Sequence, residues 1–156
     1  MKNIPYINDL STWKESFTFN HKVKVRFSET DMFGHLNNTI PFIYFEEARI
    51  EFFKSLGFMQ EWTEPTSEVI PVVADLQCDF LKQVYFDQVI DIYVKIHKIG
   101  NSSMNLHYMG ADEHKNAFFT GRGTIVQMSK KKGKGVPWST DMRTVIENVS
   151  KELIFI

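Results

Sequence analysis

Residues 26–57 read RFSETDMFGHLNNTIPFIYFEEARIEFFKSLG, a short polar turn followed by a long segment with regularly spaced apolar side chains. The apolar positions recur at helical intervals, at Phe45, Ala48, Phe52 and Leu56. This spacing marks one buried helix face and predicts a helix over about residues 39–56. The wetter face carries Tyr44, Glu47, Glu51 and Lys54. Pro41 is tolerated in the first turn of such a helix, and Gly57 stands where a helix commonly ends.

The polar turn before this helix gathers several hydrogen-bonding side chains over a few residues: Glu29, Thr30, Asp31, His35, Asn37 and Asn38. Gly34 allows the backbone to turn among them. Asn37, Asn38 and Thr39 are residue types that commonly cap a helix start. Because a helix start carries partial positive charge, the turn is a place where developing negative charge is stabilised.

Length and composition fit one globular domain over residues 1–156, with 43% hydrophobic and 24% charged residues. The net charge of −1 provides no basic field, which argues against nucleic-acid binding. Cys78 is a single cysteine, so no intrachain disulfide is expected and a reducing compartment fits. No apolar run reaches the roughly 18 residues of a membrane span, and residues 1–17 lack the apolar core of a secretory signal. We expect a cytoplasmic protein without membrane insertion.

Strand patterns flank the turn and the helix. Residues 1–16 read as an N-terminal arm, and from Val23 apolar residues alternate with basic ones in a strand that enters the turn. Residues 57–67 read as a loop. Four strand-like segments follow, near residues 69–84, 88–99, 102–112 and 117–129. Their short connections indicate antiparallel neighbours. The expected fold is α+β, with the long helix across the concave face of a curved sheet of about five antiparallel strands.

Two further features of the strand and C-terminal regions carry predictions. Gly121 and Gly123 interrupt the last strand and indicate a bulge or a close approach by a ligand or another backbone. The C-terminal segment, residues 137–156, begins with a polar run at Ser139 that predicts the cap of a short helix.

The polar turn contains the candidate catalytic groups. Asp31 lies too far before the helix to be its simple cap, and beside apolar neighbours its carboxylate is suited to act as a general base or a nucleophile. His35 either bonds to the backbone or polarises a substrate carbonyl. Asn37 and Asn38 either cap the helix or, with its first amides, hold an oxyanion. A carboxylate aimed at an electrophile beside a helix start suits acyl transfer to water.

Other chemistries lack their motifs. The five histidines are scattered without the paired spacing of metal ligands, so no metal site is predicted. The serine-hydrolase turn and the glycine-rich nucleotide loops are absent from the sequence, and no cofactor is expected. The basic group of Arg122, Lys130, Lys131 and Lys132 has two interpretations: a solvated hairpin end, or a contact for phosphate groups of a substrate or carrier.

The run SETDMFGHLNN, followed by a helix carrying FEEAR, resembles the hotdog-fold acyl thioesterases, in particular the 4-hydroxybenzoyl-CoA thioesterase-like acyl-CoA thioesterases. The resemblance covers roughly residues 20–140 and extends through VVADLQCDFLKQVYFDQVIDIYVKIHKIGNSSMNLHY. It implies that Asp31 is the catalytic carboxylate and that the backbone amide near Asn38 is the oxyanion-hole donor. It also implies a homodimer with sites at its interface, in some cases paired into a homotetramer, and coenzyme A phosphates on a basic rim.

Acyl-carrier-protein thioesterases of the same fold carry a similar segment, with an asparagine where this chain has Phe33. The expected function is therefore hydrolysis of acyl-CoA to a free fatty or other carboxylic acid and coenzyme A. An acyl-carrier-protein thioesterase and a non-catalytic acyl-binding protein of the same fold remain the alternatives.

Overall fold

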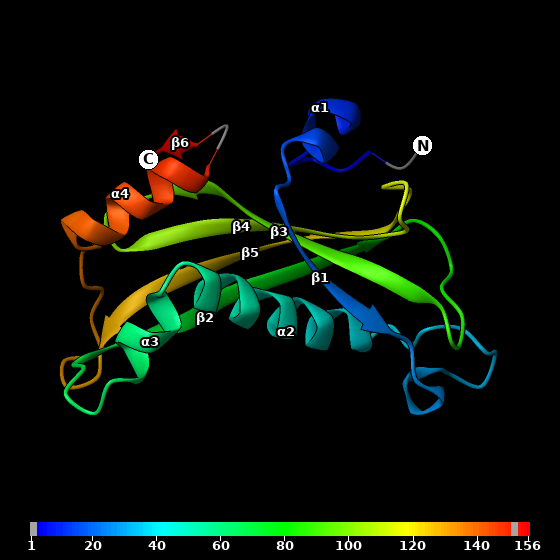
Figure 1. The fold of residues 1–156 in the computed structure, drawn as a ribbon, viewed down its shortest axis with the longest axis horizontal. Coiled ribbons are helices and arrows are strands. Elements are labelled where there is room, and N and C mark those ends of the chain that lie inside the picture. The colour runs from blue at the N-terminus through cyan, green and yellow to red at the C-terminus, as the bar shows by residue number, and fades with distance from the viewer. Residues whose placement is uncertain (1–2, 151–152) are drawn as a thin grey trace.

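A computed structural model describes residues 3–150 and 153–156, and its centre is one long helix, α2, set against one antiparallel sheet (Figure 1). The helices are α1 (Leu10–Glu15), the 3-10 helix η1 (Phe27–Glu29), α2 (Ile40–Ser55), α3 (Phe58–Thr63) and α4 (Thr140–Val149). The strands are β1 (Phe19–Lys24), β2 (Val69–Phe80), β3 (Val89–Ile99), β4 (Ser103–Ala111), β5 (Ala117–Ser129) and β6 (Ile154–Phe155). The predicted α+β hotdog architecture is confirmed.

The main sheet has the strand order β1-β3-β4-β5-β2, with antiparallel pairing throughout and with β1 and β2 at its edges. Short β6 adds a parallel pairing to β3, where Ile154 faces Lys98 in register. The four strands predicted after the helix are all present. The first of them is shorter than predicted because it ends at Phe80, where the backbone N–H groups of Leu81 and Lys82 both donate to the Phe118 carbonyl.

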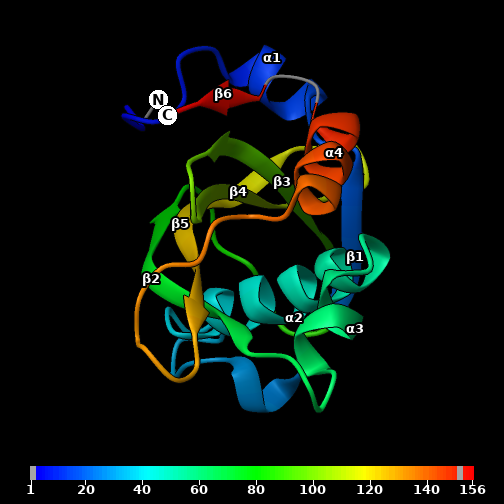
Figure 2. The same ribbon diagram turned by 90° about the vertical axis from the view of Figure 1, so that its left-hand side faces the viewer.

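Helix α2 lies in the concave face of the sheet, while α1 and β6 lie on the opposite side of the sheet, called here the outer face (Figure 2). Phe45 and Ala48 are fully buried, and the Phe45 ring stacks on Tyr108 with 4.5 Å between centroids. A Cβ added to Gly121 would lie 2.5 Å from the Phe45 ring. The close approach of another backbone predicted at Gly121 is confirmed by the Gln77 carbonyl of β2, 2.8 Å from the same point, and the Phe45 side chain of α2 is a further close neighbour.

The end of α2 agrees with the sequence in one respect and differs in two. Gly57 has φ of +81° and donates its N–H to the Lys54 carbonyl, as a helix-ending glycine does. The loop predicted over residues 57–67 is wrong, because α3 forms there and buries Trp62 against the core. The placement of Tyr44 on the wetter face is also wrong, since its side chain is buried and its hydroxyl bonds to Glu29.

The chain ends pack on or beside the sheet. The described part of the N-terminal arm predicted over residues 1–16 contains α1, capped by Asp9, which accepts a hydrogen bond from the Thr12 N–H. The predicted cap of the C-terminal helix is confirmed, since Ser139 accepts a bond from the Met142 N–H at the start of α4. Within the described residues, no helix is both long enough and apolar enough to cross a membrane.

Candidate active site

The turn that carries Asp31 is held by a closed set of short backbone bonds. The Asp31 N–H donates to the His35 carbonyl at 2.8 Å, and the Gly34 N–H donates to the Asp31 carbonyl at 3.0 Å. Gly34 has φ of +79°, a left-handed conformation that glycine adopts without steric cost. The Asp31 side chain joins this set, since its Oδ1 accepts from the Phe33 N–H at 2.8 Å and from the His35 N–H at 3.1 Å. The carboxylate is therefore fixed through one oxygen.

The second carboxylate oxygen of Asp31, Oδ2, accepts no hydrogen bond from any residue that the structure describes. Asp31 lines a cavity of about 310 Å³ between the polar turn and the connection from β2 to β3. His35, Asn38 and Lys82 also line this cavity, and Phe80 and Phe119 form part of its apolar wall. A partly bonded carboxylate thus lies beside space for an apolar substrate.

His35 lies where the turn meets the β2–β3 connection. Its ring packs edge-on against Tyr85 with 5.2 Å between centroids, and its backbone forms an antiparallel bridge with the same residue. The neighbouring Leu36 N–H donates to the Val84 carbonyl at 2.7 Å. His35 therefore has a position-fixing contact and also borders the cavity, so both roles weighed from the sequence fit its position.

The two asparagines have different surroundings. Asn37 Oδ1 accepts bonds from the Thr39 N–H at 3.0 Å and from the Thr39 hydroxyl at 2.9 Å, and Asn37 is not part of the cavity lining. Asn38 does line the cavity, and its backbone N–H donates to no acceptor in the described part of the chain. Of the two, Asn38 has a backbone donor available to a substrate oxygen near the start of α2.

Glu29 is a residue of the turn to which sequence reasoning gave no role. It is 5% exposed, and its Oε2 accepts from the Arg26 N–H at 2.9 Å and from the Tyr44 hydroxyl at 2.5 Å. Burial raises the pKa of Glu29, but the Arg26 N–H, the Tyr44 hydroxyl and the Arg26 guanidinium outweigh it and hold the pKa below its usual value. The Glu29 carboxylate therefore ties the turn to α2. The Glu29 side chain reaches back to the Arg26 N–H as in half of a capping box, but arginine lacks the acceptor of a capping residue, so no motif in the sequence marked this contact.

The basic residues grouped by the sequence are separated in the structure. Arg122 projects from the outer face of the sheet, where its Nη2 lies 2.7 Å from Asp75 Oδ2, and it lines a different cavity. The lysine run follows β5 at the end opposite Phe119, about 33 Å away along the strand at roughly 3.3 Å per residue. Lys130 Nζ donates to the Ser67 carbonyl at 2.8 Å, and Lys131 Nζ lies 2.6 Å from Glu68 Oε1. Lys132 is exposed.

The Lys82 side of the cavity was not singled out from the sequence. It belongs to the β2–β3 connection, which has no catalytic motif and joins the site only through folding. Within residues 3–150 and 153–156, no three His, Cys, Asp or Glu side chains gather closely enough to hold a metal ion.

A long helix in the concave face of an antiparallel sheet, with an anchored carboxylate and an available amide before its start, defines the hotdog class of protein. The chain belongs to the thioesterase-like superfamily, whose family model matches residues 25–146. The resemblance inferred from the sequence is thereby confirmed.

Individual relatives agree with this membership. The uncharacterized protein YsmA of Bacillus subtilis (strain 168) is 47% identical over 147 residues, which cover 94% of this chain and 97% of that protein. A thioesterase from Thermus thermophilus, solved in complex with coenzyme A and Zn, is 25% identical with a TM-score of 0.71, over 86% of this chain and 96% of that one. A 1,4-dihydroxy-2-naphthoyl-CoA thioesterase from Synechocystis shares the fold, with a TM-score of 0.75 at 14% identity, over 83% of this chain and 96% of that one.

Proposed function

We propose that this protein hydrolyses acyl-CoA thioesters to a carboxylic acid and coenzyme A in the cavity beside Asp31. The observation that carries the proposal is that the Asp31 carboxylate and the Asn38 residue with its available backbone N–H line one cavity with an apolar wall. The Thermus relative bound coenzyme A, which supports this carrier over a carrier protein. Phe33, which replaces the asparagine of acyl-carrier-protein thioesterases, is 74% exposed and is not part of the cavity lining.

Asp31 can act by either of two mechanisms, as a general base or as a nucleophile. As a general base, the carboxylate takes a proton from water, and the water oxygen adds to the thioester carbonyl. As a nucleophile, a carboxylate oxygen adds instead and forms a mixed anhydride that water then cleaves. In both routes the carbon–sulfur bond breaks and coenzyme A leaves as a thiolate that takes up a proton. The Asn38 N–H is placed to hold the carbonyl oxygen as it becomes negative.

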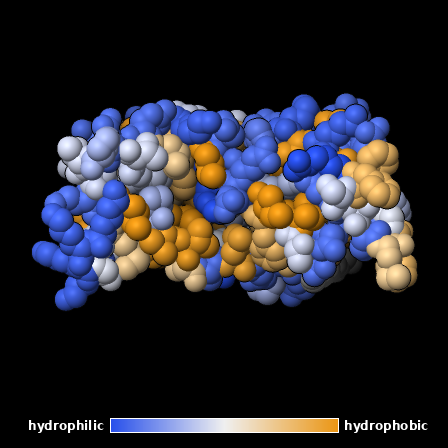
Figure 3. All heavy atoms as spheres, turned by 90° about the horizontal axis from the view of Figure 1, so that it is seen from below, coloured by the Kyte–Doolittle hydropathy of each residue, from blue (hydrophilic) through white to orange (hydrophobic). Residues whose placement is uncertain are grey.

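In this proposal, two copies of the chain form a homodimer through strand β2, and the dimer completes the site. Strand β2 is a sheet edge, and its apolar residues Ile70, Val72 and Val73 are 37%, 36% and 42% exposed. Exposed apolar edges pair readily with another strand. Figure 3, which views the molecule from the side of α2, shows hydrophobic side chains gathered on that side. Exposed Ile43 and Ile50 of α2 add to the apolar area available to a second copy.

Antiparallel pairing of two β2 strands about a two-fold axis at the middle of the strand would bring Phe80 of one subunit opposite Val69 of the other. Lys130 and Lys131 are held at Ser67 and Glu68, immediately before Val69. The partner subunit's Lys130 and the partner subunit's Lys131 then approach the cavity that Phe80 borders. Lysines remote from the cavity in one chain thereby reach its mouth in the dimer, where they bind coenzyme A phosphates.

The direct test is turnover of a panel of acyl-CoAs of varied chain length, followed through the loss of thioester absorbance. Hydrolysis by the wild-type protein, lost in Asp31→Asn, is the expected result. Hydrolysis of acyl-carrier-protein substrates alone would change the carrier. Stoichiometric acyl-CoA binding without turnover would instead identify a non-catalytic binding protein.

A further inference from the structure

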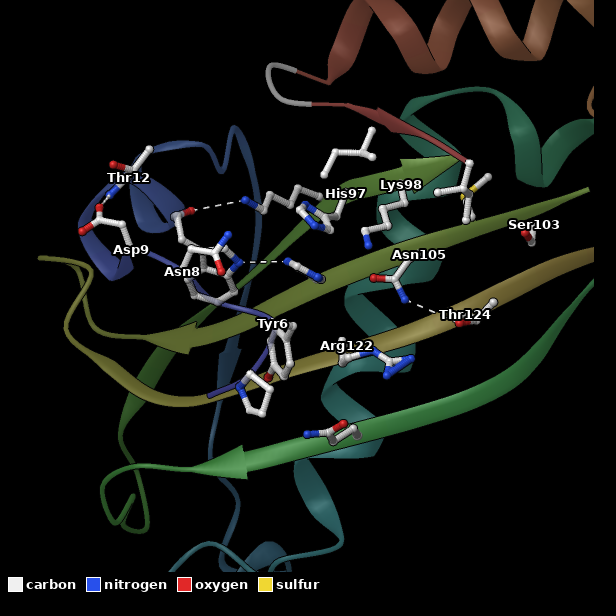
Figure 4. A pocket seen from close by; sticks show the side chains of 18 residues that line it. Tyr6, Asn8, Asp9, Thr12, His97, Lys98, Ser103, Asn105, Arg122 and Thr124 are labelled. Atoms are coloured by element: carbon white, nitrogen blue, oxygen red, sulfur yellow. Dashed lines mark hydrogen bonds between the residues drawn. The ribbon is translucent and has the colours of Figure 1, made fainter. Parts of the chain in front are cut away.

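A second and larger cavity lies on the outer face of the sheet, away from α2 and the Asp31 site. Its volume is about 810 Å³, and it lies between strands β2 to β5 and the two ends of the chain (Figure 4). Tyr6 and Trp13 from the N-terminal arm and Ile154 from β6 form part of its walls. The thioesterase proposal makes no use of this cavity.

The arm that covers this cavity is bonded to the sheet. The Tyr6 hydroxyl lies 2.9 Å from Thr120 Oγ1 and donates to Asp79 Oδ2 at 3.3 Å. The Trp13 indole N–H donates to His107 Nδ1 at 2.9 Å. Three specific bonds from the arm to buried groups of the sheet show that the cavity is a built feature of the fold.

The sheet places basic side chains in a cross-strand row beneath the arm. Lys95 pairs in register with His107, and His107 pairs with Arg122. In the next row Lys98 pairs with Asn105. Figure 4 shows Lys98, Asn105 and Arg122 extending from three neighbouring strands on the side of the sheet that carries Tyr6. The floor of the cavity is therefore rich in hydrogen-bond donors and positive charge.

A register shift in β3 adds one more group to this floor. The pairing skips His97, since Ile96 faces Leu106 and Lys98 faces Asn105. Bulges of this kind redirect side chains relative to the regular alternation of a strand. Both His97 and Lys98 consequently line the cavity, although they are adjacent in sequence.

His107 lines this cavity and carries a buried donor. Its Nδ1 accepts the Trp13 indole hydrogen, so the neutral ring carries its own proton on Nε2. Burial, followed by the positive charges of His97, Lys95, Arg122 and Lys98, lowers the pKa of His107 to about 2, which keeps the ring neutral. His107 is 1% exposed, and its Nε2 has no hydrogen-bond partner in the described part of the chain. A buried N–H without an acceptor is unfavourable and calls for an oxygen atom from outside the chain.

Of the basic side chains near the His107 donor, Lys98 is the one available to bind an anion. Lys95 is bonded to the Ser16 hydroxyl, and Arg122 is paired with Asp75. Asp9, an acidic residue of the lining, is committed to capping α1 through the Thr12 N–H. Lys98 makes no ion pair or hydrogen bond through its side chain with the residues that the structure describes. An anion at this place meets uncompensated positive charge.

We propose that the outer cavity is a second ligand site, which binds a small organic oxyanion, a phosphate or carboxylate compound, through His107 Nε2–H and Lys98. The oxyanion supplies the acceptor that the His107 donor lacks, and Arg122 adds to the positive field. The volume far exceeds that of an inorganic anion, so the ligand also has an organic body, which packs against Tyr6, Met104 and the apolar side chain of Ile154.

The test uses imidazole nitrogen–proton spectra of the isotope-labelled full chain during titration with inorganic phosphate, phenyl phosphate or acetate. The His107 Nε2–H resonance is expected to shift and saturate, with phenyl phosphate binding more tightly than inorganic phosphate if the phosphate is the recognised group. Saturation by acetate alone would identify a carboxylate ligand. A resonance that moves with none of the three would overturn the proposal and leave buried water as the acceptor.

Lys98→Gln is the variant test, because Lys98 is half-buried at the cavity and belongs to neither apolar cluster of the core. The variant should weaken binding of the active probe by about tenfold, the effect of losing one charge-assisted contact. Lys54→Gln is the matched control, an exposed lysine on α2 paired with Glu51 on the other side of the sheet. If both variants bind the probe with the same affinity, Lys98 makes no specific contact with it, and the proposed site is overturned.

Discussion

The Tyr44 hydroxyl donates a 2.5 Å hydrogen bond to the buried Glu29 carboxylate and so joins helix α2 to the turn that carries Asp31. The bond crosses from the first turns of the helix to the residues just before Asp31, where the Asn37 N–H also donates to the Glu29 carbonyl at 2.8 Å. Burial, and then the Glu29 carboxylate, raise the pKa of Tyr44 well above its usual value, so the hydroxyl stays protonated and remains a donor. The position of the Asp31 turn relative to α2 depends on this bond.

Tyr44→Phe is expected to destabilise the protein by about 1.5–3 kcal/mol, the range for a hydrogen bond to a charged group, in urea unfolding. The remaining bonds to Glu29 from Arg26 keep the carboxylate partly satisfied. Tyr85→Phe is the matched control, since its exposed hydroxyl bonds to Gln83 and its loss should cost less than about 0.5 kcal/mol. Equal losses in both variants would contradict a special role for the Glu29 bond.

Asp31→Asn is expected to lower kcat on acyl-CoA by roughly 10²-fold or more while the fold is retained. Asparagine keeps an Oδ1 that accepts the Phe33 and His35 N–H bonds, so the turn survives and only the carboxylate chemistry is lost. Asp112→Asn is a close control: Asp112 Oδ1 accepts from the N–H groups of residues 114 and 116, the same two-bond pattern at the β4–β5 turn. Near-wild-type turnover in Asp31→Asn would remove Asp31 from the mechanism.

The fold was predictable wherever one local pattern dictated one structure. The apolar spacing of Phe45, Ala48 and Phe52 marked α2, because these residues form its buried face. Apolar and polar residue types alternate along β3, and this marked the strand even though residues on both of its faces are buried. Tyr44 was misplaced for a physical reason: its hydroxyl looked like a surface group until folding supplied a buried partner, Glu29, fifteen positions earlier. Contacts between distant residues of this kind leave no periodic trace.

In the candidate site too, residues that are neighbours in sequence were predictable, and residues brought together by folding were not. Asp31, His35 and Asn38 were found because they are neighbours in a dense polar turn, and all three line one cavity. Lys82 joins that cavity only through the sheet, and Arg122 leaves the lysine run because strand alternation turns it to the outer face. His107 gave no signal, because its buried donor depends on Trp13, 94 positions away.

His107 predicts a pH dependence of stability. Its folded pKa of about 2 lies far below the unfolded value, through burial and the surrounding charges of His97, Lys95, Arg122 and Lys98. As pH falls below about 6.5, the unfolded chain binds a proton that the folded chain does not, so stability decreases with decreasing pH. From about pH 6 to pH 5, before most carboxylates titrate, this residue should remove about 1 kcal/mol.

The measurement is urea unfolding of wild type and His107→Phe across that pH window. The variant should lose the slope that His107 contributes, whatever its absolute stability. His114→Asn is the control, an exposed imidazole at the β4–β5 turn, and it should keep the wild-type slope. A His107→Phe protein with an unchanged slope would show that the buried ring titrates normally.

The proposed dimer predicts that charge on the β2 edge abolishes assembly and weakens acyl-CoA binding. Val73→Lys places an ammonium group in the β2 pairing, and sedimentation should show a monomer whose KM for acyl-CoA is raised, because the partner's lysines no longer reach the cavity. Val149→Lys makes the same change on α4 at similar exposure, 37% against 42%, and should leave the dimer intact. A fully active Val73→Lys monomer would show that one subunit holds the complete site.

The lysine run gives the test of how the carrier is bound. Replacing Lys130, Lys131 and Lys132 together by Ala should raise KM for acyl-CoA with little change in kcat, because contacts far from the reacting carbonyl bind substrate and transition state alike. The increase should shrink at higher salt, since exposed charges are screened over about 10 Å at 0.1 M ionic strength.

The charge-matched control replaces Lys14, Lys24 and Lys54 by Ala. These residues lie on α1, β1 and α2, and their replacement should leave KM unchanged. If both triple variants behave alike, the lysine run is a solvated hairpin end and coenzyme A is held by other residues. A larger defect on acyl-carrier-protein substrates than on acyl-CoA would instead make the run a docking site for the acidic surface of a carrier protein.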